Sequence, residues 1–182
     1  MSPGSPRRLM GINALSTPEE AVMPRAITPN LWFDTQAEEA ARYYCSIFPG
    51  SRIVGVTHYT EAAPEKAGQV LTVDFELQGR RFTALNGGPQ FTFNEAVSFL
   101  IECQDQAELD AYWARLTDGG EEGPCGWCKD RYGLSWQVVP AGMGELFGDD
   151  DPERARRAME AMFGMRKLDI AALRAAAEGA AA

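Results

Sequence analysis

The sequence predicts an α+β fold in which one unit, ordered strand, helix, strand, strand, strand (βαβββ), occurs twice in tandem. The units span residues 27–88 and 96–140, and a helical tail follows over 141–182. Three observations predict this fold. Apolar and β-branched runs between Gly- and Pro-containing turns are typical of a β-rich chain. Both helical segments open on the same three residues, at 36–38 and at 106–108. The order of elements around them is also the same, which indicates an internal repeat.

The first unit begins with a strand predicted over 27–34. Thr35 and Glu38 have the spacing of a capping box, in which each side chain satisfies an orphan amide at a helix start. The helix ends at Pro49-Gly50. Its apolar residues recur at helical spacing and form one buried face: Ala37, Ala40, Ala41, Tyr44 and Phe48.

Three strands complete the first unit, over 51–60, 69–78 and 80–86. Gly79 supplies the hairpin turn between the last two strands, and Gly87-Gly88-Pro89 ends the unit. Glycine and proline at these places are the usual turn residues.

The second unit repeats this order, with a first strand over 96–103 and a capping box from Asp105 to Glu108. Short strands are predicted over 121–124, 126–129 and 134–140. The helix between them ends at Gly119-Gly120 and buries one face: Leu109, Tyr112, Trp113 and Leu116.

The chain ends differ in composition from the units. Residues 1–26 contain four prolines and predict a flexible leader outside the fold. In the tail, the acidic run 149–151 followed by Pro152 is typical of a helix N-terminus, and Asp169 caps a last Ala-rich helix. An apolar stripe on the first tail helix either docks on its own domain or forms a homodimer contact: Ala155, Ala158, Met159, Met162 and Phe163.

Charge and composition exclude several classes of function. The 182 residues carry a net charge of −9, and residues 27–140 alone account for −8 of it, so nucleic acid is a poor partner. No run approaches the roughly 20 apolar residues that cross a bilayer, which argues against a membrane protein. Arg7-Arg8 precede an apolar run too short for an export signal, and four scattered cysteines suit a reducing compartment. We therefore expect a cytoplasmic protein.

Several longer motifs resemble the PhnB-like branch of the vicinal oxygen chelate superfamily, the superfamily of glyoxalase I, bleomycin-resistance proteins and extradiol dioxygenases. They are LWFD at 31–34, FPGSRI at 48–53, ALNGGP at 84–89, FNEA at 93–96 and WCKDRYGLSWQ at 127–137. The resemblance covers residues 26–175. It implies a glyoxalase-like domain over 27–140, a small-molecule ligand and a homodimer.

Members of this branch are often labelled 3-demethylubiquinone-9 3-methyltransferase. A methyltransferase of the usual kind needs a Gly-rich turn between a strand and a helix, where the backbone approaches the cofactor closely. Gly87-Gly88 follows a predicted strand but precedes a loop, and Gly79 and Gly133 lie in hairpins. The sequence therefore disfavours a methyltransferase and predicts no organic cofactor.

The resemblance also implies a divalent metal, held by side chains from the first and last strands of each unit. The resemblance places Gln137 there, because it stands where family members carry a ligand glutamate in the pattern D-x-x-G-x-x-x-E. Counting from Gly79 gives Thr83 as its equivalent in the first unit, and counting back from the helix starts gives Asn30 and Ser98. Neutral amides and hydroxyls bind divalent cations weakly, so these residues disfavour a metal. A one-residue register error would bring Asp34, Asp74 or Glu102 into the site, which keeps a metal-dependent lyase or dioxygenase as the alternative.

The remaining expectation is a sheet-lined cup that binds a small organic molecule. By strand periodicity Asn30, Trp32 and Asp34 share one face, as do Ser98 and Glu102. If the protein is an enzyme, a lyase, isomerase or oxygenase is expected, with Glu102 or Asp34 as the general base. A cup filled by its own side chains would instead indicate an interaction module. The predicted ligand-binding residues are Asn30, Trp32, Thr83, Asn86, Ser98 and Gln137.

Two other features weigh against metal or redox chemistry. The only histidine, His58, lies on a predicted strand away from the expected ligand positions. Cys125 and Cys128 have redox-motif spacing, but they lie in a loop-to-strand segment rather than at a helix start, where the dipole lowers a thiol pKa. We interpret them as an incidental pair.

Overall fold

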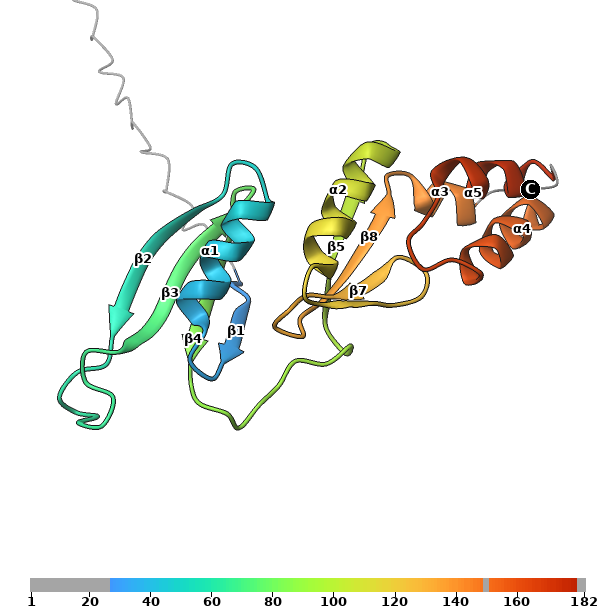
Figure 1. Cartoon of the computed structure of the whole chain (residues 1–182). Coiled ribbons are helices and arrows are strands. Elements are labelled where there is room, and N and C mark those ends of the chain that lie inside the picture. The colour runs from blue at the N-terminus through green and yellow to red at the C-terminus, as the bar shows by residue number, and fades with distance from the viewer. Residues whose placement is uncertain (1–26, 149–150, 180–182) are drawn as a thin grey trace, which may run out of the picture.

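The computed structural model describes residues 27–148 and 151–179 (Figure 1). The predicted leader over 1–26 and the acidic residues Asp149 and Asp150 lie outside the described residues. The elements of the first unit are β1 (Asn30–Phe33), α1 (Ala37–Ile47), β2 (Arg52–His58), β3 (Val70–Leu77) and β4 (Arg80–Asn86). Those of the second are β5 (Ser98–Cys103), α2 (Gln106–Thr117), β6 (Glu121–Glu122), β7 (Trp127–Lys129) and β8 (Ser135–Pro140).

Each unit forms its own four-stranded sheet, with strand order β1-β4-β3-β2 in the first and β5-β8-β7-β6 in the second. In both sheets the first strand runs parallel to the last, and the other neighbours are antiparallel. The identical order confirms the predicted α+β fold with two tandem βαβββ modules.

The strand register follows from the turns. Gln78 and Gly79 both have positive φ, 50° and 82°, and form a tight turn that pairs Leu77 with Arg80. Asp74 then lies opposite Thr83, and Thr83 opposite Asn30. In the second sheet Ser98 pairs with Ser135, whereas Gln137 pairs with Leu100. The hydrogen bonds from the Gly87 and Ala141 amides to the Phe33 and Cys103 carbonyls align the ends of the two sheets, and with them Thr83 and Gln137. The predicted equivalence of Asn30 and Ser98 is therefore wrong by two residues, because Leu100 occupies the position of Asn30.

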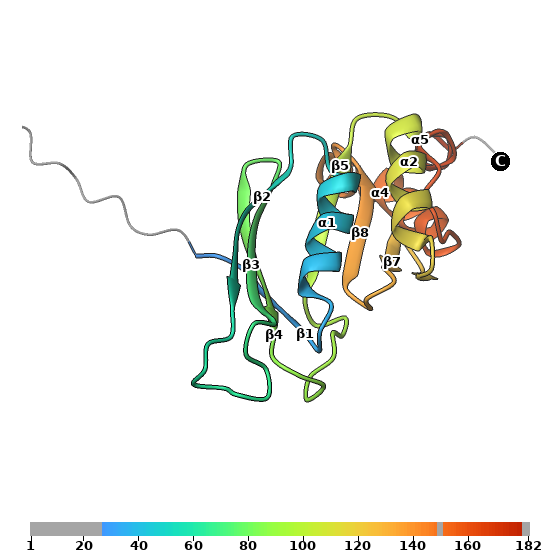
Figure 2. The same cartoon turned by 60° about the vertical axis from the view of Figure 1, so that its left-hand side comes forward.

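The helix-bearing faces of the two sheets share one aromatic core. Both predicted helix faces are buried, and Tyr44 and Phe48 of the first module contact Trp136 of the second with ring centroids 5.7 and 5.3 Å apart. Figure 2 shows α1 between the two sheets. Arg115 of α2 donates hydrogen bonds to the carbonyls of Ser46 and Ile47 at the end of α1. Because these faces meet in the core, the opposite faces of the two sheets turn away from it, toward solvent.

The two helices start differently. In α2 the prediction is confirmed, because Asp105 accepts a hydrogen bond from the Glu108 amide and the Glu108 carboxylate accepts one from the Gln104 amide. In α1 the predicted capping box is wrong. The N-cap residue is Gln36, with no side-chain cap of its own, and the amide of Ala37 instead donates to Asn86 Oδ1 of β4 at 2.8 Å.

The tail forms α3 (Met143–Phe147), α4 (Pro152–Phe163) and α5 (Ile170–Ala177) beside the second module (Figure 1). The sequence did not predict α3. The predicted caps of the other two helices are confirmed, since Asp151 and Asp169 both accept hydrogen bonds from their helix amides. Of the apolar stripe, Ala158 is buried, whereas Phe163 is 64% exposed.

The segment between α4 and α5 attaches the tail to the second module. The carbonyls of Met165 and Arg166 accept hydrogen bonds from the amides of Cys125 and Gly126, at 2.8 and 2.7 Å. Leu168 is fully buried beside Gly126. Within the described residues, no helix is long and apolar enough to span a membrane.

Candidate functional site

The open face of the first sheet carries a row of polar side chains. Asn30, Thr83 and Asp74 lie side by side on β1, β4 and β3. The Thr83 hydroxyl donates a 2.6 Å hydrogen bond to Asp74 Oδ1. The next row holds Trp32, Leu85 and Thr72, and the Thr72 hydroxyl is 2.6 Å from that of Thr57. This face therefore presents oriented acceptors and donors rather than an apolar packing surface.

Trp32 forms the aromatic part of this face, and a glycine makes room for it. A Cβ at Gly87 would lie 2.2 Å from the Trp32 ring, so any larger residue would displace the indole. The indole Nε1 donates to the Gly88 carbonyl at 2.8 Å, and Phe91 packs edge-on at 5.0 Å between centroids. The Gly87-Gly88 motif thus supports an aromatic wall.

The open face of the second sheet has the same design. The Gln137 amide donates to the Ser98 hydroxyl at 2.8 Å, and Trp127 pairs with Gln137 on the neighbouring strand. Leu100 lies in the same row and is 55% exposed. Polar side chains beside a tryptophan thus occur on both open faces.

A cavity of about 350 Å³ lies on this second face, and its lining includes Trp127, Lys129 and Ser135. Ser135 is only 1% exposed. Its hydroxyl oxygen is buried and has no hydrogen-bond partner among the described residues. Buried polar groups in native proteins are nearly always paired, so an unpartnered hydroxyl at a cavity wall indicates a position where a ligand or water bonds.

Charged groups surround the mouth of this cavity. Lys129 Nζ lies 2.5 Å from Glu95 Oε1, and this contact lowers the pKa of Glu95 and raises that of Lys129, so both are charged at neutral pH. Glu121 and Glu122 also line the cavity. Glu122 accepts a hydrogen bond from Trp113 Nε1, a neutral donor that leaves its charge uncompensated.

The structure separates the predicted site residues into three groups. Asn30, Trp32 and Thr83 lie on the open face of the first sheet, and Ser98 and Gln137 on that of the second. Within one chain these two groups do not face each other. Asn86 belongs to neither, because its side chain is buried and its amide bonds Ala37 N and Val70 O, at 2.8 and 3.0 Å.

The two carboxylates proposed as general bases lie apart. Asp34 follows β1 and is exposed, and Glu102 is exposed near the end of β5 in the other module. They line different cavities, Asp34 beside Tyr59 and Lys66, and Glu102 beside Phe82 and Tyr112. No single cavity joins them among those that these residues line.

The donor sets on the two faces do not fit a divalent metal. Asp74 and Glu76 both stand on the first face, but an oxygen of Asp74 already accepts from Thr83, and Glu76 forms ion pairs with Arg52 and Arg81. Ser98 and Gln137 are neutral and bond each other. Among the described residues no three His, Cys, Asp or Glu side chains cluster as metal ligands. Neutral oxygen donors beside carboxylates that are already bonded or ion-paired compete poorly for such ions.

The cysteines are also unsuited to redox chemistry. Cys125 and Cys128 are free thiols, and Cys128 is buried. Burial, with the nearby charges of Asp130 and Glu122, raises the pKa of Cys128 to about 12, which keeps it a protonated thiol.

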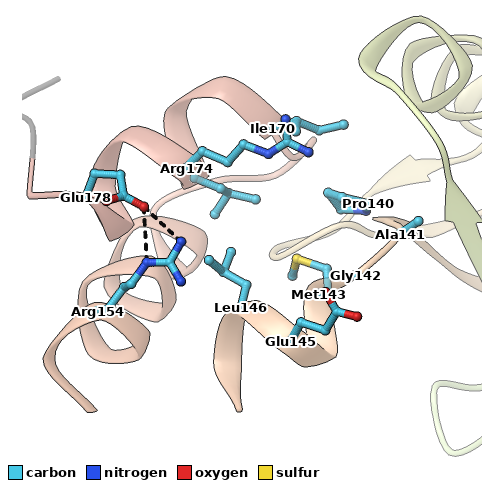
Figure 3. Close-up of a pocket in the computed structure, with 11 residues that line it drawn as sticks. Pro140, Ala141, Gly142, Met143, Glu145, Leu146, Arg154, Ile170, Arg174 and Glu178 are labelled. Carbon is cyan, nitrogen blue, oxygen red and sulfur yellow. Dashed lines mark hydrogen bonds and ion pairs between the residues drawn. The ribbon is translucent and has the colours of Figure 1, made fainter. Parts of the chain in front are cut away.

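A larger cavity of about 560 Å³ lies between the tail helices and the end of β8 (Figure 3). Its floor is apolar and includes Leu146 and Leu173. Arg154 donates to Glu178 Oε1 through Nε and Nη2, at 3.1 and 2.8 Å. The cavity belongs to the tail and lies outside the duplicated modules.

The sequence reasoning missed Lys129, Ser135 and Asp130 of the second module, and it named Asp74 of the first only as a residue that a register error would bring into the site. Asp74 follows from the Gln78-Gly79 turn, which pairs it with Thr83. Lys129 and Ser135 could not be placed beside each other without the register of β7 and β8, in which they pair. Asp130 accepts hydrogen bonds from the amides of Tyr132 and Leu134 and from Trp136 Nε1, and so holds the turn before β8.

Two tandem βαβββ modules with open, polar sheet faces define a protein of the vicinal oxygen chelate superfamily. The sequence profile of the family described as 3-demethylubiquinone-9 3-methyltransferase matches residues 25–139. The chain therefore belongs to this PhnB-like family. No curated protein sequence matches the chain.

Solved structures are similar over the two modules. A putative 3-demethylubiquinone-9 3-methyltransferase, PhnB protein, from Bacillus cereus is 33% identical, with 62% of this chain and 98% of that chain covered and a TM-score of 0.55. A protein from Pseudomonas aeruginosa shares the fold at 19% identity, 63% and 95% coverage and a TM-score of 0.53. The fosfomycin resistance protein FosX from Listeria monocytogenes is 15% identical, with 66% and 94% covered and a TM-score of 0.45.

Proposed function

We propose that this protein binds a small organic molecule in a cup assembled by a homodimer, in which the open face of the first module meets the open face of the second module of another copy. The observation that carries the proposal is the pair of matching open faces. Each presents hydrogen-bonding side chains beside a tryptophan, and within one chain the two faces turn away from each other.

The chemistry of the faces suits a ligand with a flat or apolar part and polar groups. Small-molecule sites are mostly apolar with a few placed polar groups that fix orientation. Trp32 and Trp127 supply the apolar walls, while Asn30, Thr83 and Gln137 supply donors and acceptors. The sequence predicted one cup in which Asn30 and Gln137 hold the same ligand. In the proposed dimer they do so only when Asn30 comes from one copy and Gln137 from the other.

A direct screen tests binding. Thermal unfolding is measured for the full chain against a panel of small metabolites, and molecules released by denaturing the purified protein are identified by mass spectrometry. A ligand that raises the unfolding temperature for the wild type but not for Trp32→Ala or Trp127→Ala supports the proposal. Stabilisation that survives both substitutions would place the ligand elsewhere.

Mixing two defective variants tests the dimeric cup. Trp32→Ala damages the first module and Trp127→Ala the second, so each homodimer loses both cups. Heterodimers isolated through two different tags have one cup with both substitutions and one cup with neither, and should bind about half the ligand of wild type. Heterodimers that bind nothing would show that each cup forms within one chain.

The alternative, a metal-dependent lyase or dioxygenase, is tested by elemental analysis of protein purified without chelator. Because no three His, Cys, Asp or Glu side chains of the described residues cluster as metal ligands, we expect well below one nickel, zinc, manganese or iron per chain. A stoichiometric metal would favour the alternative. A methyltransferase is disfavoured because the strand-to-helix turns of both modules, residues 34–36 and 104–105, contain no glycine.

A further inference from the structure

We infer that the ligand of the second module's cavity is a small organic ammonium ion, an inference that rests on the proposed function and names its ligand class. The cavity brings together a buried hydroxyl that has no partner among the described residues, a half-buried tryptophan and an excess of carboxylates.

The unpartnered hydroxyl of Ser135 indicates that the cavity is built for a ligand. Ser135 is 1% exposed, and its oxygen finds no partner among the described residues. Its neighbours across the strands, Ser98 and Lys129, direct their polar atoms to Gln137 and Glu95. A ligand that carries a hydroxyl or an N–H group would complete the bonding of Ser135.

The charge of the lining selects a cation. Lys129 neutralises Glu95 through their 2.5 Å contact. Glu121 pairs with Lys129 across β6 and β7, and Glu122 follows it with only a neutral indole donor. Three carboxylates against one ammonium group leave an excess of two negative charges, which repels anions and attracts a positively charged ligand.

Trp127 supplies the surface on which such a cation rests. It lines the cavity and is half-buried, so part of its ring is accessible. A cation over an indole face is attracted by the negative charge of the ring face, and tryptophan is the strongest of the aromatic side chains in this contact. Trp127 and the carboxylates thus act on the same charged group.

Three probes of similar shape but different charge test whether the cavity selects its ligand by charge. Choline is positive, 3,3-dimethylbutan-1-ol is its neutral analogue, and 3,3-dimethylbutanoate is negative. Titration calorimetry on the full chain should show choline binding at least about tenfold more tightly than the neutral alcohol, with the anion weakest. Equal affinities for choline and the alcohol, or tighter binding of the anion, would overturn the inference.

Variants assign the preference to the cavity. Glu121→Gln should reduce the choline preference severalfold, while Glu160→Gln, an exposed carboxylate on α4, should leave it unchanged. Ser135→Ala should weaken choline binding without lowering the urea midpoint, because it removes a hydroxyl that bonds no other described residue. A fall in the midpoint with unchanged choline affinity would make Ser135 structural and contradict the inference.

The two proposals fail in different ways. If the wild type binds choline but heterodimers of Trp32→Ala and Trp127→Ala bind no ligand, the dimeric cup is overturned and the ammonium ligand is not. Restored cups that prefer the neutral or anionic probe would overturn the ammonium ligand alone.

Discussion

The two modules share one strand order but start their helices by different means, and the difference shows how far local sequence determines this fold. In the second module Asp105 and Glu108 cap α2 within five residues of chain. In the first, Asn86 reaches from β4, 49 residues away, to the amide of Ala37. The first helix therefore depends on a completed sheet, whereas the second carries its own start signal.

The modules also differ at their outer edges. The second has the shorter strands, with two residues in β6 and three in β7, and the tail packs against the turn between them. The strands β2 and β3 of the first module have seven and eight residues. In the second module, the tail segment between α4 and α5 thus packs at an edge where the first module has longer strands.

The largest expected effect tests this dependence on the tail. Leu168→Ala removes a fully buried side chain beside Gly126 and should lower the free energy of unfolding by about 3 kcal/mol. Urea denaturation followed by tryptophan fluorescence measures it. Met159→Ala, an exposed position on α4, serves as the control and should change stability by less than about 0.5 kcal/mol. Equal effects would mean that the tail does not support the module.

An intermediate effect compares the two helix caps. Asn86→Ala removes the hydrogen bonds that the Asn86 side chain makes with the Ala37 amide and the Val70 carbonyl, and should cost about 2 kcal/mol. Asp105→Ala removes an exposed cap and should cost about 1 kcal/mol. Circular dichroism in urea gives both values. A cost for Asp105→Ala that equals or exceeds that of Asn86→Ala would contradict the distinction between a distant and a local cap.

The smallest expected effect is a pH dependence of stability that comes from Asp130, in the turn before β8. The corresponding turn of the first module, Gln78-Gly79, contains no titratable side chain. Burial raises the pKa of Asp130 above its ordinary value of 3.8. A raised carboxyl pKa means that the folded state holds the proton more tightly. The stability that this proton confers is complete below pH 3.8 and is lost as the pH rises through the folded pKa.

The comparison with Asp130→Asn isolates this contribution, because asparagine does not titrate. The stability of the wild type relative to the variant should fall as the pH rises above about 4, by about 1 kcal/mol or less. Urea midpoints of both proteins from pH 3 to pH 7 provide the measurement. If the stability of the wild type relative to Asp130→Asn instead rises from pH 3 to pH 7, the assigned direction of the pKa shift is wrong.

The fold could be predicted because its signals are local. Helical spacing, glycine turns and the repeated order of elements gave both modules and both buried helix faces. The site could be predicted only in part. Asn30 and Trp32 follow from strand alternation, but the role of Asn86 depends on a contact across 49 residues. The cap at Asp105 could be predicted because its partner, the Glu108 amide, lies three residues away.

The separation of the predicted ligand residues had no sequence signal. Side chains such as Tyr44, Phe48 and Trp136 decide which faces of the two sheets meet. Their periodicity predicts that they are buried, but it does not predict that the two modules bury them against each other. The same limit hid Ser135, which reads as an ordinary strand residue until its environment is known.

The two hydrogen bonds from Cys125 and Gly126 to the tail have a consequence for how chains of this kind are shortened or fused. These bonds join main-chain atoms only, but Cys125 has a positive φ of 56°, which disfavours β-branched residues there, and a Cβ at Gly126 would lie 2.8 Å from the Val138 carbonyl. A shortened chain that ends at β8 exposes both amides and uncovers the space filled by Leu168. Such a truncation therefore needs a redesigned turn over 124–127, and an appended domain is better joined after α5 than in place of the tail.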